Sequence, residues 1–236
     1  MFILAPCTIR EPCKTMQLAV QSQFPSHADI RSAEILASVR QAFVDKGFDG
    51  ASMQDLARAA GMSVGNFYRY FASKSAIIQA LILQDAAQIR NDFAAIINSV
   101  DPMATLRRAI HDRISSSACA NNVNLWAEIE AASHRSPEIA AASRQMEAEV
   151  VGQFLAVFAK GADMSIEQAH RLFSASAAYI LVMVKAASCL SCAAPLDQDQ
   201  VRSMILRSID QTLAEVSATS AAPVAPAAAS QPPSTI

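Results

Sequence analysis

Apolar residues recur every three or four positions from about residue 28 to residue 216, which is the spacing of amphipathic helices. No stretch favours strands, and the pattern predicts about nine helices. The apolar stripes consist of Ile35, Leu36, Val39 and Phe43; Ile78, Leu81, Ile82, Ile89, Phe93 and Ile96; Leu106, Ile110 and Ile114; Leu125, Ile129 and Ala132; Ile139, Met146, Val150, Phe154 and Phe158; and Val201, Ile205, Leu213 and Val216.

Capping residues predict where these helices begin and end. A short polar side chain before an apolar run can accept hydrogen bonds from the first free N–H groups, and proline is favoured at the first helical position. Glycine ends helices because it adopts positive φ without strain. The predicted starts are Ser52 with Asp55, Ser63, Ser73, Asp101-Pro102, Ser136-Pro137, Ser165 with Gln168, and Asp197 with Gln200; the predicted ends are Gly47, Ala60 before Gly61, about Phe71, Gly161, Leu190 and residue 216.

Composition agrees with an all-α fold. Hydrophobic residues make up 52% and charged residues 17% of the chain, and only 6 of 236 residues are glycine, too few for the loops of nucleotide-binding α/β folds. Residues 1–27 lack a helical period and contain three prolines, which predicts a flexible arm. Residues 217–236 hold seven Ala, four Pro and four Ser, which predicts a disordered tail.

Charge and cysteine content limit the compartment and the partners. The formal net charge is -2, so a nucleic-acid partner would need a local basic patch. The start of the chain has no basic segment typical of a secretory leader, and no apolar run approaches the roughly 18 residues of a membrane span. We therefore expect a reducing cytoplasm, no membrane partner and free cysteines; these are Cys7, Cys13, Cys119, Cys189 and Cys192.

The stretch from Ser52 to Lys74 predicts two short helices joined by a tight turn. Ala57 is small where two helices would cross, and Gly61 supplies the positive φ of the turn. Phe67 would lie on the inward face of the second helix and hold it against the first. This spacing is typical of a helix-turn-helix, whose second helix enters the major groove of DNA.

The outward residues of that second helix suit DNA. Gly65 would let the backbone come close to a bulky partner, and Asn66 can pair bidentately with adenine. The helix dipole favours phosphate near Ser63 and near Lys74, at the starts of two helices. No acid occurs between Leu56 and Gln84, a stretch that holds Arg58 among its three cations. Tyr68, Arg69 and Tyr70 offer hydroxyl and guanidinium groups to phosphates or base edges. The alternative is that the two tyrosines are core aromatics, and it applies most of all to Tyr70.

From about Ala28 to Asp85 the sequence resembles the N-terminal domain of TetR-family transcriptional regulators. The resemblance lies in Lys46-Gly47-Phe48, in the segment from Ser52 to Gly61, and in the segment from Ser63 to Lys74. It implies a helix-turn-helix domain over residues 28–75 and a helical domain for ligand binding and dimerisation over residues 76–216. The DNA-binding residues that it implies are Ser52, Gln54, Ser63, Val64, Gly65, Asn66, Tyr68 and Lys74, with Val64 standing where many members carry a basic or polar residue.

The resemblance also implies a homodimer through the last two helices, near residues 166–190 and 198–216. Apolar residues on more than one face of the first of these helices agree with burial by a second chain, although a central helix of the monomer would have the same pattern. Two binding helices would then meet a near-palindromic duplex. A small apolar or amphipathic effector would enter the C-terminal domain; the candidate lining residues are Phe93, Trp126, Met146, Phe154 and Met183, each of which is also a plausible core residue.

No catalytic motif, cofactor motif or metal-ligand spacing is present in the sequence. His111, His134 and His170 are dispersed, and the Cys189–Cys192 pair lacks the second pair that a zinc site needs. We therefore expect a ligand-released, homodimeric repressor that is not an enzyme. The alternative is a helical redox-responsive or protein-interaction module that uses Cys189 and Cys192 without an organic effector.

Overall fold

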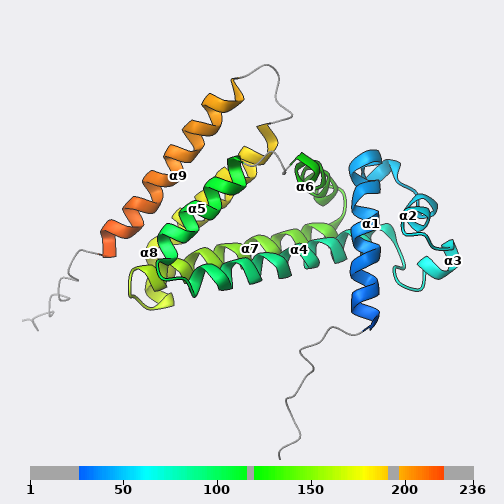
Figure 1. The fold of residues 1–236 in the computed structure, drawn as a ribbon, viewed down its shortest axis with the longest axis horizontal. Helices are drawn as coiled ribbons and strands as arrows, with labels where there is room; N and C mark the ends of the chain where they lie inside the picture. The colour runs from blue at the N-terminus through cyan, green and yellow to red at the C-terminus, as the bar shows by residue number, and fades with distance from the viewer. Residues whose placement is uncertain (1–26, 116–119, 191–196, 221–236) are drawn as a thin grey trace, which may run out of the picture.

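The computed structural model describes residues 27–115, 120–190 and 197–220 (Figure 1). Within these ranges the chain forms nine helices and no strand, which confirms the predicted all-α fold. The helices are α1 (His27–Gly50), α2 (Met53–Ala59), α3 (Val64–Phe67), α4 (Lys74–Ile97), α5 (Pro102–Ser115), α6 (Ala120–Ser133), α7 (Pro137–Gly161), α8 (Ile166–Cys189) and α9 (Gln198–Ser220).

The predicted helix starts are confirmed by the hydrogen bonds at the caps. Ser52 and Ser165 form capping boxes with Asp55 and Gln168, and Ser63 and Ser136 accept hydrogen bonds from backbone N–H groups of the helices that follow them. Asp101 Oδ1 accepts from the Ala104 N–H at 2.9 Å and thereby caps α5. These local contacts satisfy N–H groups that would otherwise have no partner in the helix.

Several predicted boundaries differ from the structure. The first helix was expected to end at Gly47, but α1 is only interrupted there and continues to Gly50. The helix from Ser63 was expected to run to about Phe71, but α3 ends at Phe67 and continues as a turn, in which Arg69 N bonds Asn66 O and Tyr70 N bonds Phe67 O. These tighter bonds span three residues where an α-helix spans four, so the last turn departs from α-helical geometry. At the other end of the chain, α9 extends to Ser220, so the first four residues of the expected tail are helical. The expected arm loses His27 to α1, and residues 1–26 and 221–236 lie outside the described residues.

The side chains form two hydrophobic clusters that share the long helices α4 and α7. The first cluster joins α1–α3 to the first half of α4, to α6 and to the start of α7; its fully buried members include Phe43, Phe48 and Phe67. The second joins the remainder of α4 and α7 to α5, α8 and α9 around Phe154 and Phe158. Figure 1 shows α4 and α7 lying side by side along the molecule, with α1–α3 at one end and α9 at the other.

Helix α8 is the most apolar of the long helices. Its segment Ile166–Ser188 has a mean hydropathy of 1.2, which by length and composition meets the requirement for a membrane span, although only 22% of its most apolar window is buried within the chain. One face, which includes Phe173, Ala177 and Ile180, packs into the second cluster. A second apolar face remains exposed, and it is considered below under the proposed function.

Candidate nucleic-acid interface

Helices α2 and α3 are held at a fixed angle by a short turn and a shared apolar contact. Gly61 in the turn has φ +65°, which only glycine adopts readily, and the Met62 N–H reaches back to Ala57 O at 2.9 Å. Leu56, Ala57 and Phe67 are fully buried between the helices. The side chain of Phe67 therefore anchors α3, as the sequence predicts, and leaves its opposite face to solvent.

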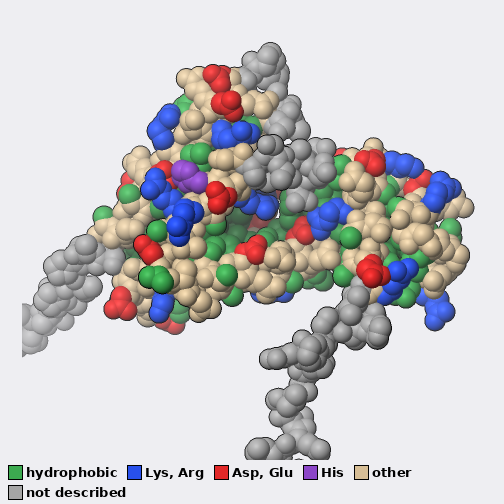
Figure 2. Space-filling model, in the orientation of Figure 1, with side chains coloured by type: hydrophobic (Ala, Val, Ile, Leu, Met, Phe, Trp, Pro, Cys, Tyr) green, Lys and Arg blue, Asp and Glu red, His purple; other side chains and the backbone are tan. Residues whose placement is uncertain are grey.

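The exposed face of α3 carries the residues that the sequence assigns to DNA. Ser63, Gly65 and Asn66 are exposed, whereas Val64 is half-buried. Tyr68 and Tyr70 in the following turn are 49% and 40% exposed, so neither tyrosine is a core residue of this chain. Figure 2 shows Lys and Arg side chains gathered around the end of the molecule that α1–α3 form.

Gly65 is a helical glycine that the fold does not require, unlike Gly47 and Gly61, whose φ angles are positive. Its φ is not positive, and a Cβ at this position would have no heavy atom within 4 Å. Glycine within a helix costs roughly 0.5–1 kcal/mol relative to alanine. The chain therefore carries a destabilising residue at an exposed position where an alanine would fit.

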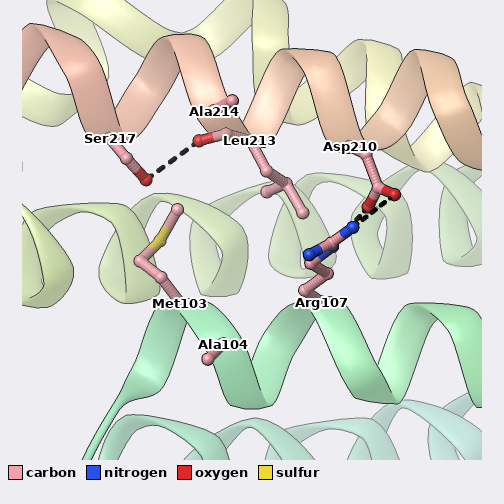
Figure 3. Close-up of a pocket in the computed structure, with 7 residues that line it drawn as sticks. All are labelled: Met103, Ala104, Arg107, Asp210, Leu213, Ala214 and Ser217. Carbon is pink, nitrogen blue, oxygen red and sulfur yellow. Dashed lines mark hydrogen bonds and ion pairs between the residues drawn. The ribbon is translucent and has the colours of Figure 1, made fainter.

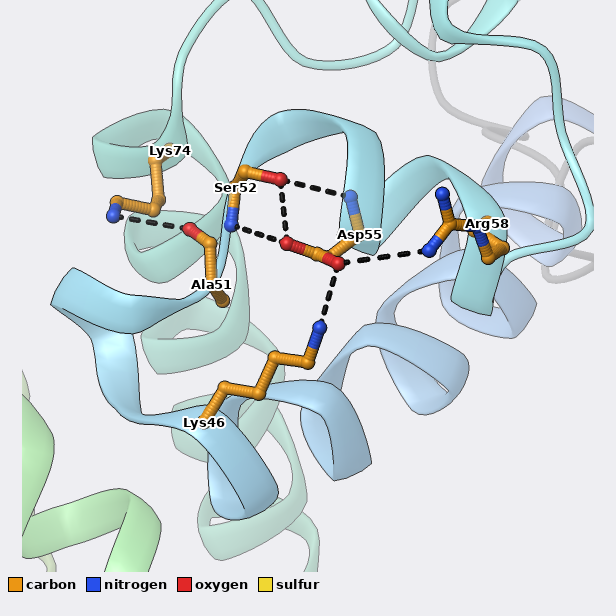
Figure 4. Close-up of polar contacts among 6 residues, drawn as sticks. All are labelled: Lys46, Ala51, Ser52, Asp55, Arg58 and Lys74. Atoms are coloured by element: carbon orange, nitrogen blue, oxygen red, sulfur yellow. Dashed lines mark hydrogen bonds and ion pairs between the residues drawn. The ribbon is translucent and has the colours of Figure 1, made fainter.

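Ion pairs neutralise Asp55, an acid in the first turn of α2. Asp55 accepts a hydrogen bond from Lys46 Nζ at 2.6 Å, and Arg58 Nη1 lies 3.8 Å from the same carboxylate oxygen (Figure 4). The hydrogen bonds from Lys46 and Ser52 hold the pKa of Asp55 well below its usual range. The Ser52 hydroxyl donates to Asp55 Oδ2 at 2.5 Å, so its proton is already bonded within the capping box.

Lys74 begins α4, where the sequence predicts a phosphate contact, and its ammonium is partly engaged within the chain. Its ammonium donates to the backbone carbonyls of Asp49 and Ala51 at 3.2 and 3.1 Å, and Figure 4 shows the second of these contacts. Two of its three N–H donors are thus bonded within the chain, so a phosphate would meet only the third. Gln54 on α2 and Arg69 in the turn after α3 are both exposed.

The five candidate effector residues do not lie together. Phe93 and Phe154 contact edge to face, with ring centroids 5.2 Å apart, and Met183 packs against the same cluster. Trp126 and Met146 belong to the first cluster instead. Cys192 lies outside the described residues, as does the side chain of Cys189.

A groove of about 300 Å³ lies between α5 and α9 and is lined by none of the candidate effector residues. Arg107 crosses it to form two hydrogen bonds, each 2.7 Å long, with the Asp210 carboxylate (Figure 3). The remaining walls of the groove come from Met103, Ala104, Leu213, Ala214 and Ser217. Among the described residues no group of three His, Cys, Asp or Glu side chains is arranged to hold a metal ion.

Known proteins with similar sequences match part of this chain. Residues 35–81 match the family model described as bacterial regulatory proteins, tetR family. The chain is 32% identical over 111 residues to the HTH-type transcriptional regulator UidR of Escherichia coli K12, and 37% identical over 84 residues to EthR of Mycolicibacterium smegmatis. These alignments cover 45% and 35% of this chain, and 54% and 39% of the two relatives, so the chain spans about half the length of the relatives it matches, or less.

Solved structures resemble the fold over most of its length. Salmonella enterica GusR superposes with a TM-score of 0.57 at 23% identity, covering 80% of this chain and 98% of that one. A TetR transcription regulator from Haloarcula marismortui superposes with a TM-score of 0.64 at 15% identity, covering 79% and 97%. The fold is therefore that of a helix-turn-helix protein with a C-terminal helical domain. Residues 35–81 therefore match the N-terminal domain of TetR-family regulatory proteins, and the remaining helices resemble the fold of such proteins.

Proposed function

We propose that this chain is a DNA-binding transcriptional regulator whose α3 lies in the major groove. The observation that carries the proposal is Gly65, an exposed helical glycine that the fold itself does not need. A bare backbone at this position permits close approach of a large, rigid partner. Asn66 beside it can read an adenine edge, and the anchored Phe67 keeps both in a fixed orientation.

Phosphate contacts would come from around α3. Ser52 and Gln54 lie at the start of α2, and Tyr68, Arg69 and Tyr70 extend the exposed face beyond α3. Ser63 and Val64 would meet the backbone and a thymine methyl group, respectively. Such contacts fix position on the duplex, whereas Asn66 supplies sequence preference.

Mobility shift on DNA upstream of the chain's own gene tests this assignment. Asn66→Ala should relax base preference by about 1–3 kcal/mol, while Lys74→Ala should weaken binding to all sequences alike and reduce its salt dependence. Gln145→Ala, an exposed change on α7, is the matched control. Unchanged binding by both Asn66→Ala and Lys74→Ala would refute the assigned roles.

We further propose that two copies pair through α8 and α9. On α8 five exposed apolar residues follow one another at alternating intervals of three and four positions, which is the heptad spacing of a seam between packed helices. They are Leu172, Ala175, Tyr179, Val182 and Ala186. Met204 on α9 is 56% exposed, and the Tyr179 hydroxyl bonds that of Ser208, which brings the two helices together beside this seam.

Light scattering after gel filtration tests the dimer. Val182→Arg places a charge in the seam and should yield monomers. Leu83→Arg is the matched control, because Leu83 on α4 is as exposed as Val182, at 59% against 55%, and lies outside the seam. The proposal fails if Val182→Arg remains as dimeric as the parent chain.

The same proposal includes release from DNA by a small apolar or amphipathic effector, with the protein acting as a repressor in the cytoplasm. Its support is the aromatic pair Phe93–Phe154 with Met183 in the second cluster, and the half-buried Trp126 in the first. An effector releases the protein from DNA only if it binds the conformation with low DNA affinity more tightly than the conformation that binds DNA. Screening apolar compounds for loss of the mobility shift, with Trp126 fluorescence as a direct readout, would identify it.

A further inference from the structure

Helix α6 contacts the α1–α2 corner, by which we mean residues 47–51. Glu128 Oε2 accepts a hydrogen bond from the Phe48 N–H at 2.9 Å, a contact between residues 80 positions apart. The Glu128 side chain is half-buried. This carboxylate therefore reaches from the C-terminal domain to the backbone just before the helix-turn-helix.

The geometry of the corner directs that N–H toward α6. Gly47 has φ 69° and ψ 167°, which breaks the α-helical geometry of α1 at this residue. A Cβ on Gly47 would lie 3.3 Å from Glu128 Oε2, so glycine also leaves the space that the carboxylate occupies. The Phe48 side chain is 1% exposed and packs edge to face on Phe43, which fixes the backbone at this point.

Two further side chains hold the same corner. Arg135, just after α6, pairs with the Asp49 carboxylate at 2.8 Å. Lys74 of α4 donates to the carbonyls of Asp49 and Ala51. Since Ala51 precedes the Ser52 cap directly, any shift of the corner changes the start of α2 and with it the position of α3.

We propose that Glu128 is a positioning residue that sets the orientation of α2 and α3 through the Phe48 N–H. This inference rests on the proposed DNA-binding function. The bond joins a charged acceptor to a partly buried donor, and such bonds are stronger than neutral ones. Among the contacts described at the corner, it is the one that bonds α6 to the backbone itself, so a displacement of α6 acts on the helix-turn-helix directly.

The test compares Glu128→Ala with Glu128→Gln in the full chain. Glu128→Ala should speed hydrogen exchange of the Phe48 amide and of the α2 and α3 amides about tenfold, and should weaken binding to the upstream duplex by a similar factor. Glu128→Gln keeps an acceptor oxygen and should restore most of both. Ile129→Val, a fully buried change on the same helix, controls for general loss of stability and should leave DNA affinity unchanged.

Each remaining outcome decides one of the two proposals. Faster exchange at Phe48 with unchanged DNA affinity would overturn the positioning role, as would an equal loss of affinity in Ile129→Val. If the parent chain binds no duplex, the proposed function fails. The positioning role is then judged by exchange alone, and unchanged α2 and α3 amides in Glu128→Ala overturn it.

Discussion

Replacing Gly65 by alanine should move stability and DNA affinity in opposite directions. The folded chain should gain about 0.5–1 kcal/mol, because the added methyl meets no heavy atom within 4 Å and alanine loses less backbone entropy on folding. The same methyl would stand between the α3 backbone and the groove. A displaced helix would lose contacts such as the Asn66 pair, each worth about 1–3 kcal/mol, so affinity should fall at least about tenfold.

Gly152→Ala is the matched control for this change. Gly152 is also an exposed helical glycine with no heavy atom within 4 Å of an added Cβ, but it lies in the middle of α7. Both variants should raise the urea midpoint by a similar amount. Only Gly65→Ala should weaken binding in a fluorescence anisotropy titration with labelled duplex.

Two results would refute this reasoning. Parental DNA affinity in Gly65→Ala would mean that the backbone at Gly65 does not approach the duplex. A loss of stability in Gly65→Ala would mean that the fold itself needs glycine there, and the position would then say nothing about a partner.

Two further predictions concern stability. Phe67→Ala should lower the free energy of unfolding by about 3–5 kcal/mol in denaturant titration, because it empties the contact between α2 and α3, whereas Tyr68→Ala next to it should change stability by less than about 0.5 kcal/mol. Arg107, by its hydrogen bonds, lowers the pKa of Asp210 from 3.8 to about 2, with a smaller contribution from His111. The ionised form therefore stabilises the fold above about pH 4, and this stabilisation is lost as the pH falls toward 2. Asp210→Asn should remove that part of the pH dependence, and a parent and variant that lose stability in parallel over this range would contradict it.

Local sequence signals were sufficient for most of the fold. The caps at Ser52, Ser63 and Ser165 depend on residues three positions apart, so the sequence contains both partners of each contact. The predicted end of α3 was wrong because the residues after Phe67 are compatible with either a helix or a turn. These residues are Tyr68, Arg69 and Tyr70. Which of the two forms depends on the packing of Phe67 and Phe71 against distant residues.

Contacts between distant residues could not be predicted in this way. Nothing near Glu128 in the sequence indicates that its partner is the Phe48 N–H, and Lys74 carries no signal that it bonds the carbonyls of the corner. The candidate effector residues were chosen by side-chain type alone. The fold separates Trp126 from Phe93 because Trp126 on α6 packs against the first cluster, whereas Phe93, in the second half of α4, belongs to the second.

Because α4 and α7 contribute to both hydrophobic clusters, the N-terminal and C-terminal halves of such a protein are not readily exchanged between relatives. Ile77 and Ile82 of α4 belong to the first cluster, while Phe93 and Ile96 of the same helix belong to the second. A chimaera that joined the N-terminal helices of one relative to the C-terminal helices of another would therefore bring together residues of α4 and α7 that come from different parents. We expect such chimaeras to combine mismatched apolar surfaces on α4 and α7, and therefore to be less stable than either parent.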